Sequence, residues 1–153
     1  MEKGNAGMSL RYLFPFKGKV PYNYFKKSMI SNPVTLGENL RNKRIELGLS
    51  QSQVARILDT DAQYVYAWEN NHNKPIISKY PKIIEFLGYF PFEIDTSTLS
   101  GKIKKYRYLH GLSQEKMAHF LNVDEGTIRG YEREKRAPKF GKIINLIRIM
   151  GVF

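Results

Sequence analysis

Residues 41–70 read RNKRIELGLSQSQVARILDTDAQYVYAWEN, and the same plan returns 63 positions later, at residues 104–133, as KKYRYLHGLSQEKMAHFLNVDEGTIRGYER. Extended outward, residues 35–90 align with residues 98–153 without a gap, and 16 of the 56 positions are identical. Chance does not plausibly give an ungapped match of this length, so the chain carries an internal duplication.

The duplication divides the chain into four segments. We predict an N-terminal arm at residues 1–34, repeat one at 35–90, a linker at 91–97 and repeat two at 98–153. The net charge of +11 is shared unevenly among them. The arm has six basic and one acidic residue, repeat one has seven and six, and repeat two has twelve and five. A polyanionic partner would therefore meet the arm and repeat two.

Helix start and stop signals follow one another along repeat one. Gly48 suits the left-handed cap at the end of a first helix. Ser50 and Gln53 carry the signature of a capping box that begins a second helix. Asp61 can cap a third helix, and Pro81 suits the first turn of a last one. Apolar residues on the inward faces of these helices are Leu36, Leu40, Leu47, Val54, Ala55, Leu58, Val65, Trp68, Ile83, Ile84 and Leu87.

Repeat two follows the same plan. Its helices are expected to begin near Leu99, Gln114 and Glu125, with a last helix across about 142–150. Ser113 lacks the Gln or Glu three residues on that a capping box needs, so only a simple cap is predicted there. Ile128 and Tyr131 are the inward pair of the third helix, as Val65 and Trp68 are in repeat one.

Two short helices joined by a tight turn form a helix-turn-helix unit, whose second helix can enter the DNA major groove. Four sequence features recur in both repeats. They are Arg-x3-Gly-Leu-Ser-Gln (44–51 and 107–114), an Ala four residues later, Val/Ile-x-x-Trp/Tyr-Glu (65–69 and 128–132) and a later Pro. On these features each repeat resembles the helix-turn-helix domain of phage repressors and Cro proteins. The resemblance covers 112 of the 153 residues.

The resemblance implies an all-α fold of two tandem repressor-like helix-turn-helix bundles, each of four to five helices, with an N-terminal arm. In that family an arginine of the first helix commonly pairs with the glutamate that ends the third. Arg44 with Glu69, and Arg107 with Glu132, occupy these places, and we interpret both pairs as structural. The resemblance also implies a bacterial or phage-type cytoplasmic protein that is associated with the nucleoid when bound to DNA.

The outward faces of the two third helices differ. In repeat one the expected DNA contacts are Ala62, Gln63, Tyr66, Ala67 and Asn70. In repeat two they are Glu125, Gly126, Thr127, Arg129, Gly130 and Arg133. Amide side chains suit adenine, whereas arginine suits guanine or a phosphate. Two outward glycines in one helix are compatible with close approach by another backbone, or with simple tolerance of glycine.

Phosphate contacts are expected on either side of these helices. Gln51 and Gln114 begin the second helices, where exposed N–H groups and the helix dipole favour an anion. Further expected contacts, in the loop after each third helix, are Lys74, Lys135, Arg136 and Lys139. For any single loop lysine, a solvated surface charge is an equal alternative.

Several function classes are disfavoured. The chain has no cysteine, which excludes disulfides and thiolate chemistry and fits a reducing cytoplasm. His72, His110 and His119 have no metal-ligand spacing, and no nucleophile or phosphate-loop motif occurs, so we expect no metal, no cofactor and no enzymatic activity. No apolar run reaches the roughly 20 residues of a membrane span, and no secretory signal is expected.

Other interpretations stay open. The arm mixes aromatic residues with lysines between residues 11 and 34, and either packs over repeat one or follows the DNA backbone or minor groove. Repeat one, nearly neutral, could be a protein–protein module or a homodimer interface, with repeat two alone on DNA. An antitoxin that binds both a toxin and its operator is a third possibility. A seven-residue linker spans at most about 25 Å, which suits two unlike half-sites on neighbouring turns.

Overall fold

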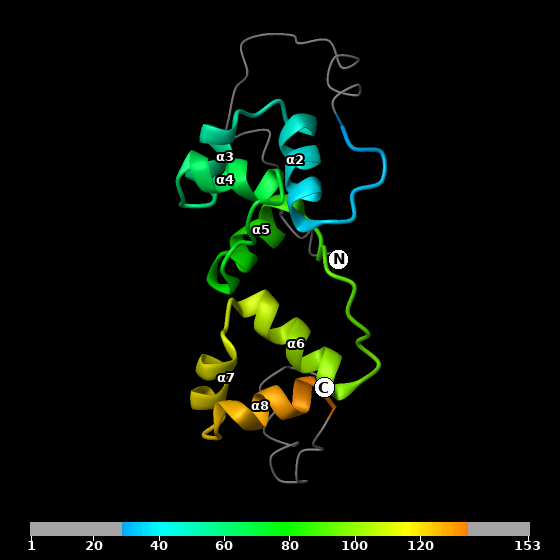
Figure 1. Ribbon diagram of the computed structural model, residues 1–153, viewed down its shortest axis with the longest axis vertical. Coiled ribbons are helices and arrows are strands. Elements are labelled where there is room, and N and C mark those ends of the chain that lie inside the picture. The colour runs from blue at the N-terminus through cyan, green and yellow to red at the C-terminus, as the bar shows by residue number, and fades with distance from the viewer. Residues whose placement is uncertain (1–28, 135–153) are drawn as a thin grey trace, which may run out of the picture.

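The computed structural model describes residues 29–134, in which every regular element is helical, so the predicted all-α architecture is confirmed for this part of the chain (Figure 1). The helices of repeat one are α2 (Leu36–Glu46), α3 (Gln51–Ile57), α4 (Ala62–Glu69), the short 3-10 helix η2 (Ile77–Lys79) and α5 (Tyr80–Leu87). Those of repeat two are α6 (Leu99–His110), α7 (Gln114–Phe120) and α8 (Glu125–Glu132).

The interpretations of the arm before residue 29, of Lys135, Arg136 and Lys139, and of a helix near 142–150 lie outside the described residues. Within them, α6, α7 and α8 begin at the three predicted positions.

Side chains cap the first helices of repeat one. Thr35 Oγ1 accepts the Glu38 backbone N–H at 3.1 Å while the Glu38 carboxylate accepts the Thr35 N–H at 3.0 Å. That backbone N–H is the main reason why the pKa of Glu38 lies below its ordinary value. Ser50 and Gln53 form the predicted capping box at the start of α3. Asp61 occupies the N-cap of α4, but its side chain makes no capping hydrogen bond.

The core of repeat one gathers the inward faces of α2 to α5. Leu40, Val54, Leu58, Val65 and Ile83 are fully buried within it. The last helix differs from the sequence expectation in one position, because Phe86 is buried at 2% exposure whereas Ile84 is only half-buried. A helix this short has room for one buried stripe, and Ile83, Phe86 and Leu87 form it.

The second core lies among α6, α7 and α8 and is built on Ile103, Met117 and Ile128, all fully buried. Tyr131 is 7% exposed here, and its counterpart Trp68 is 5% exposed in repeat one, so both are core residues as predicted.

The two repeats follow one another along the long axis of the molecule and meet where α5 lies beside α6 (Figure 1). Three aromatic rings meet at this junction. Tyr80 of α5, Phe92 of the linker and Tyr108 of α6 lie with ring centroids 4.8 to 5.0 Å apart. Burial raises the pKa of both tyrosines. The linker is therefore part of the contact between the repeats as well as a covalent tether.

A close approach fixes the start of α2 against the end of α4. A Cβ atom built on Gly37 would lie 1.8 Å from the Trp68 carbonyl oxygen, a distance that real atoms do not adopt. Only glycine therefore allows these two helix ends to pack as they do. Gly126, at the start of α8, offers the opposite case, because nothing lies within 4 Å of a Cβ built there.

We predict that Gly37→Ala lowers the free energy of unfolding by about 3 kcal/mol, because backbone overlap outweighs the roughly 1 kcal/mol that alanine gains in a helix. Urea denaturation followed by Trp68 fluorescence measures this. The control, Gly126→Ala, should be neutral or more stable by up to about 1 kcal/mol by circular dichroism. Equal stability of Gly37→Ala and the unchanged protein would contradict the packing described here.

Candidate nucleic-acid interface

A buried cluster of hydrogen bonds joins three helices of repeat one. The Arg44 guanidinium on α2 binds the Glu69 carboxylate at the end of α4 through two bonds, Nε to Oε1 at 2.7 Å and Nη2 to Oε2 at 2.8 Å. Arg44 Nη1 also donates to the Leu49 carbonyl oxygen at 3.2 Å. Gln51, the first residue of α3, donates its side-chain Nε2–H to Glu69 Oε2 at 2.9 Å. We call this four-residue arrangement the brace.

Repeat two contains the same brace. Arg107 Nε and Nη2 lie 2.5 and 3.0 Å from the two carboxylate oxygens of Glu132. Arg107 Nη1 donates to the Leu112 carbonyl at 2.6 Å, and Gln114 Nε2 donates to Glu132 Oε2 at 2.7 Å. The Arg107 and Glu132 side chains are 7% and 6% exposed. Both expected Arg–Glu pairs are thus brought together, and each orients a third helix relative to the two before it.

Gln51 and Gln114 serve the brace as well as the surface. Sequence reasoning assigned both to phosphate contact and did not foresee their bonds to the buried glutamates. The amide nitrogen of each glutamine is engaged inside the protein, and both side chains are half-buried at the start of α3 and α7. A phosphate contact by either glutamine stays a prediction.

The outer face of α4 is polar but carries no basic residue. Gln63, Tyr66 and Asn70 are exposed, whereas Ala67 is half-buried. Ala62 also belonged to the expected contact set, yet it is half-buried and packs against the core of repeat one. Ala62 is therefore turned partly toward the core, and a DNA contact by this residue stays a prediction.

Two of these side chains are held by neighbours. Asn70 Nδ2 donates to the Tyr66 carbonyl oxygen at 2.8 Å, which uses one of its two amide hydrogens. The Tyr66 ring, in a residue that is 51% exposed, meets His72 edge-on with centroids 5.8 Å apart. Gln63 is an exposed amide at the start of the same face.

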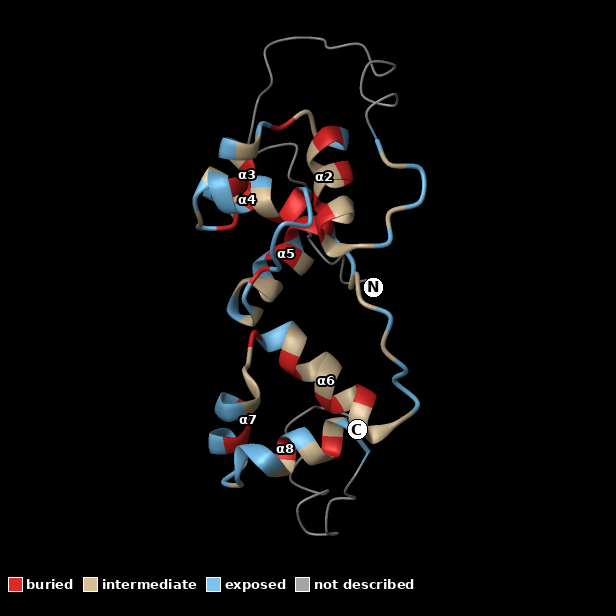
Figure 2. Cartoon of the chain, in the orientation of Figure 1, coloured by how far each residue is buried: buried red, intermediate tan, exposed pale blue. Residues whose placement is uncertain are grey.

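The outer face of α8 is cationic. Gly126, Arg129 and Arg133 are exposed, while the expected contacts Thr127 and Gly130 are half-buried. Arg129 is paired with Glu125 one turn earlier, Nη2 to Oε1 at 2.5 Å, and both side chains are close to half exposed, at 49% and 44%. The exposed stretches of α4, α7 and α8 appear pale blue in Figure 2.

Sequence reasoning missed two features of this surface. Tyr64 is 45% exposed on α4 and stacks on Trp68 with centroids 6.4 Å apart. The pairing of Glu125 with Arg129 was also missed, although opposite charges four residues apart in a helix are a readable signal.

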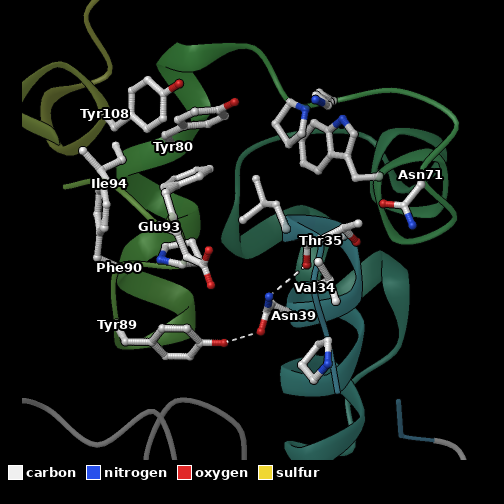
Figure 3. A pocket seen from close by; sticks show the side chains of 18 of the residues that line it. Val34, Thr35, Asn39, Asn71, Tyr80, Tyr89, Phe90, Glu93, Ile94 and Tyr108 are labelled. Carbon is white, nitrogen blue, oxygen red and sulfur yellow. Dashed lines mark hydrogen bonds between the residues drawn. The ribbon is translucent and has the colours of Figure 1, made fainter. Parts of the chain in front are cut away.

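Lys74 is exposed in the loop after α4 and also lines a cleft of about 930 Å³ between the repeats. Val34, Thr35 and Asn39 form one wall of the cleft, and the opposite wall comes from the linker and the aromatic junction (Figure 3). Tyr89 closes one end by donating its hydroxyl hydrogen to Asn39 Oδ1 at 2.6 Å. Trp68 is the only residue of α4 that lines the cleft, so this hollow is separate from the outer faces of α4 and α8.

Within residues 29–134, no three His, Asp or Glu side chains gather in a way that could hold a metal ion. No helix of the described part of the chain is long and apolar enough to cross a membrane.

The helix-turn-helix family matches the chain twice, at residues 40–93 and 103–152, which together make up more than half of it. The chain therefore belongs to this family, and the resemblance to phage repressor and Cro domains is confirmed. Domains of the family bind DNA and are typically non-enzymatic. Neither a protein of curated function nor a solved structure matches this chain.

We predict that Arg107→Ala lowers the free energy of unfolding of repeat two by about 3 kcal/mol, since it leaves the buried Glu132 carboxylate without its main partner. Chemical denaturation followed by circular dichroism measures the loss. Lys43→Ala removes a cation from an exposed pair with Glu46 and should cost less than about 1 kcal/mol. Similar small losses for both variants would show that the brace does not stabilise the fold.

Proposed function

We propose that this chain is a sequence-specific double-stranded DNA-binding protein that regulates transcription without enzymatic activity, with α4 and α8 entering successive major grooves. The observation that carries the proposal is that each repeat holds its third helix on a buried brace and leaves the outer side of that helix exposed and polar. A braced helix with an exposed face is what reading base edges requires. The proposal places the protein in the cytoplasm, on the nucleoid when bound.

The arrangement of the repeats supports a pair of reading helices within one chain. The helix-turn-helix units α3–α4 and α7–α8 lie toward the same side in Figure 1, and the linker runs along the opposite side. The contact between α5 and α6 and the aromatic junction hold the units next to one another. On this proposal a single chain spans two half-sites and does not need a second copy.

The two helices would read different sequences. Gln63 and Tyr66 on α4 offer an amide for adenine and an aromatic ring for a thymine methyl group. Arg129 and Arg133 on α8 offer guanidinium groups for guanine or phosphate. Lys135, Arg136 and Lys139 follow α8 in the sequence and would add phosphate contacts there. The proposed division places most of the electrostatic attraction on repeat two.

We predict that affinity for duplex DNA falls steeply with salt, with a log–log slope near −0.9 for each phosphate contacted. Arg129→Ala should weaken binding to a selected duplex by about tenfold or more. Lys82→Ala removes one positive charge from α5, where Lys82 pairs with Asp59, and should change affinity less than twofold by the same fluorescence anisotropy titration. A salt-independent affinity would contradict the proposed function.

A protein partner, or a second copy of the chain, on repeat one is a second candidate. The observation that favours it is that α4 exposes two tyrosines, Tyr64 and Tyr66, at 45% and 51%, and no basic residue. Tyrosine is enriched at protein interfaces, and the core of an interface is poor in charge. On this alternative repeat two alone would bind DNA.

The double variant Gln63→Ala/Tyr66→Ala separates the two candidates in the full chain. If α4 reads bases, the variant should lose about tenfold in affinity for the selected duplex and keep its oligomeric state. If α4 is a protein interface, DNA affinity should be unchanged, whereas self-association measured by sedimentation equilibrium, or capture of a partner, should be lost.

A further inference from the structure

Arg129 is held by two side chains from different helices of repeat two. Its Nη2 donates to Glu125 Oε1 on α8 at 2.5 Å, and its Nε lies 3.5 Å from Gln114 Oε1 at the start of α7. Gln114 is itself fixed, because its Nε2 donates to the buried Glu132 carboxylate. A continuous chain of hydrogen bonds therefore runs from the brace to an exposed arginine on the outer face of α8.

The two contacts engage Nε and Nη2 of the Arg129 guanidinium group. Nε–H and one Nη2–H form its side edge, the edge with which Arg44 and Arg107 bind their glutamates. Within residues 29–134 no hydrogen bond engages Nη1 of Arg129, so the end edge that Nη1 forms with Nη2 is open to a ligand. Two parallel donors on one edge match the O6 and N7 acceptors of guanine in the major groove.

Charge favours a guanine over a phosphate as that ligand. The Glu125 carboxylate beside Nη2 offsets much of the positive charge of Arg129 and would repel a phosphate brought to the same place. Attraction to phosphate depends on net charge, whereas a bidentate contact with guanine depends on the placement of two donor hydrogens. An arginine that is both neutralised and oriented is therefore poorly suited to phosphate and well suited to a base.

Repeat one supplies an internal comparison. Its brace includes the same glutamine bond, Gln51 to Glu69, but Ala62 and Tyr66 stand where repeat two has Glu125 and Arg129. The brace is therefore common to both repeats, and its extension to a reading side chain belongs to repeat two alone within the described residues.

We propose that Glu125 and Gln114 are positioning residues that present the end edge of Arg129 to a single guanine, and that Glu125 also lowers the affinity of repeat two for DNA of other sequences. This inference rests on the proposed function. It assigns Glu125 a role through Arg129 and not a contact of its own with DNA.

The test uses the full chain and a duplex recovered by selection from a random pool. Each guanine of the half-site bound by repeat two is replaced in turn by 7-deazaguanine, which lacks the N7 acceptor. The unchanged protein should lose about tenfold in affinity at one guanine and little at the others. Arg129→Ala should bind the original duplex and the duplex modified at that guanine equally.

Glu125→Ala should show a several-fold smaller difference in affinity between the original duplex and the duplex modified at that guanine. It should also bind a random-sequence duplex more tightly than the unchanged protein does. Glu115→Ala, which removes an exposed acidic residue from α7, is the control matched in charge and should leave discrimination unchanged. Thermal unfolding of Glu125→Ala should match that of the unchanged protein, because the pair with Arg129 is half exposed. A structural role alone would shift unfolding and leave discrimination intact.

Two outcomes overturn the inference while the proposed function stands. In one, Arg129→Ala weakens binding equally on all duplexes and reduces the salt slope by about 0.9, as a phosphate contact would. In the other, Glu125→Ala and Glu115→Ala have the same discrimination at that guanine and the same affinity for a random-sequence duplex. Failure of the unchanged protein to bind any selected duplex is a different result, and it would remove the proposed function itself.

Discussion

The largely buried ion pair between Arg44 and Glu69, repeated as Arg107 and Glu132, is the interaction on which the rest of the structure depends. Two buried charges lose their hydration, and their attraction offsets that cost only when the remaining hydrogen-bonding groups are also satisfied. Each brace meets this condition through a leucine carbonyl and a glutamine amide, and the described residues contain no buried side-chain polar atom without a partner. The positions of the brace residues therefore allow little variation, and the brace sets the orientation of α4 and α8 relative to the helices that precede them.

A scaffold held in this way tolerates change on its outer faces. All four residues of the brace are identical in the two repeats. On the outer face, repeat two has Arg129 where repeat one has Tyr66. Such surface positions contribute little to stability, so their side chains can diverge toward different ligands. The same reasoning explains why repeat one can be nearly neutral and repeat two strongly basic on one fold. The proposed difference in specificity follows from the outer faces, whereas the brace is common to both repeats.

Much of this fold could be predicted from residue spacing. The 63-residue offset indicated the duplication, and Ser50 with Gln53 marked a helix start correctly because caps are local interactions. The junction of Tyr80, Phe92 and Tyr108 could not be predicted, since it depends on the path of the linker between repeats. On the candidate surface, helical periodicity placed Arg129 on the exposed face. In α5 it favoured Ile84 as an inward residue, where Phe86 is buried instead. Rotation by a fraction of a turn at a helix end is set by packing, which spacing alone does not reveal.

Selection of binding sites from a random duplex pool by the purified full chain tests the central claim most directly. If two braced helices with unlike faces read DNA together, one motif should be enriched, with two different half-sites about 10 base pairs apart from centre to centre. The half-site assigned to α8 should contain guanine, and that assigned to α4 should contain A·T pairs. Enrichment of a symmetric palindrome would contradict reading by a single chain and indicate a homodimer. Absence of any enriched motif would contradict sequence-specific reading altogether.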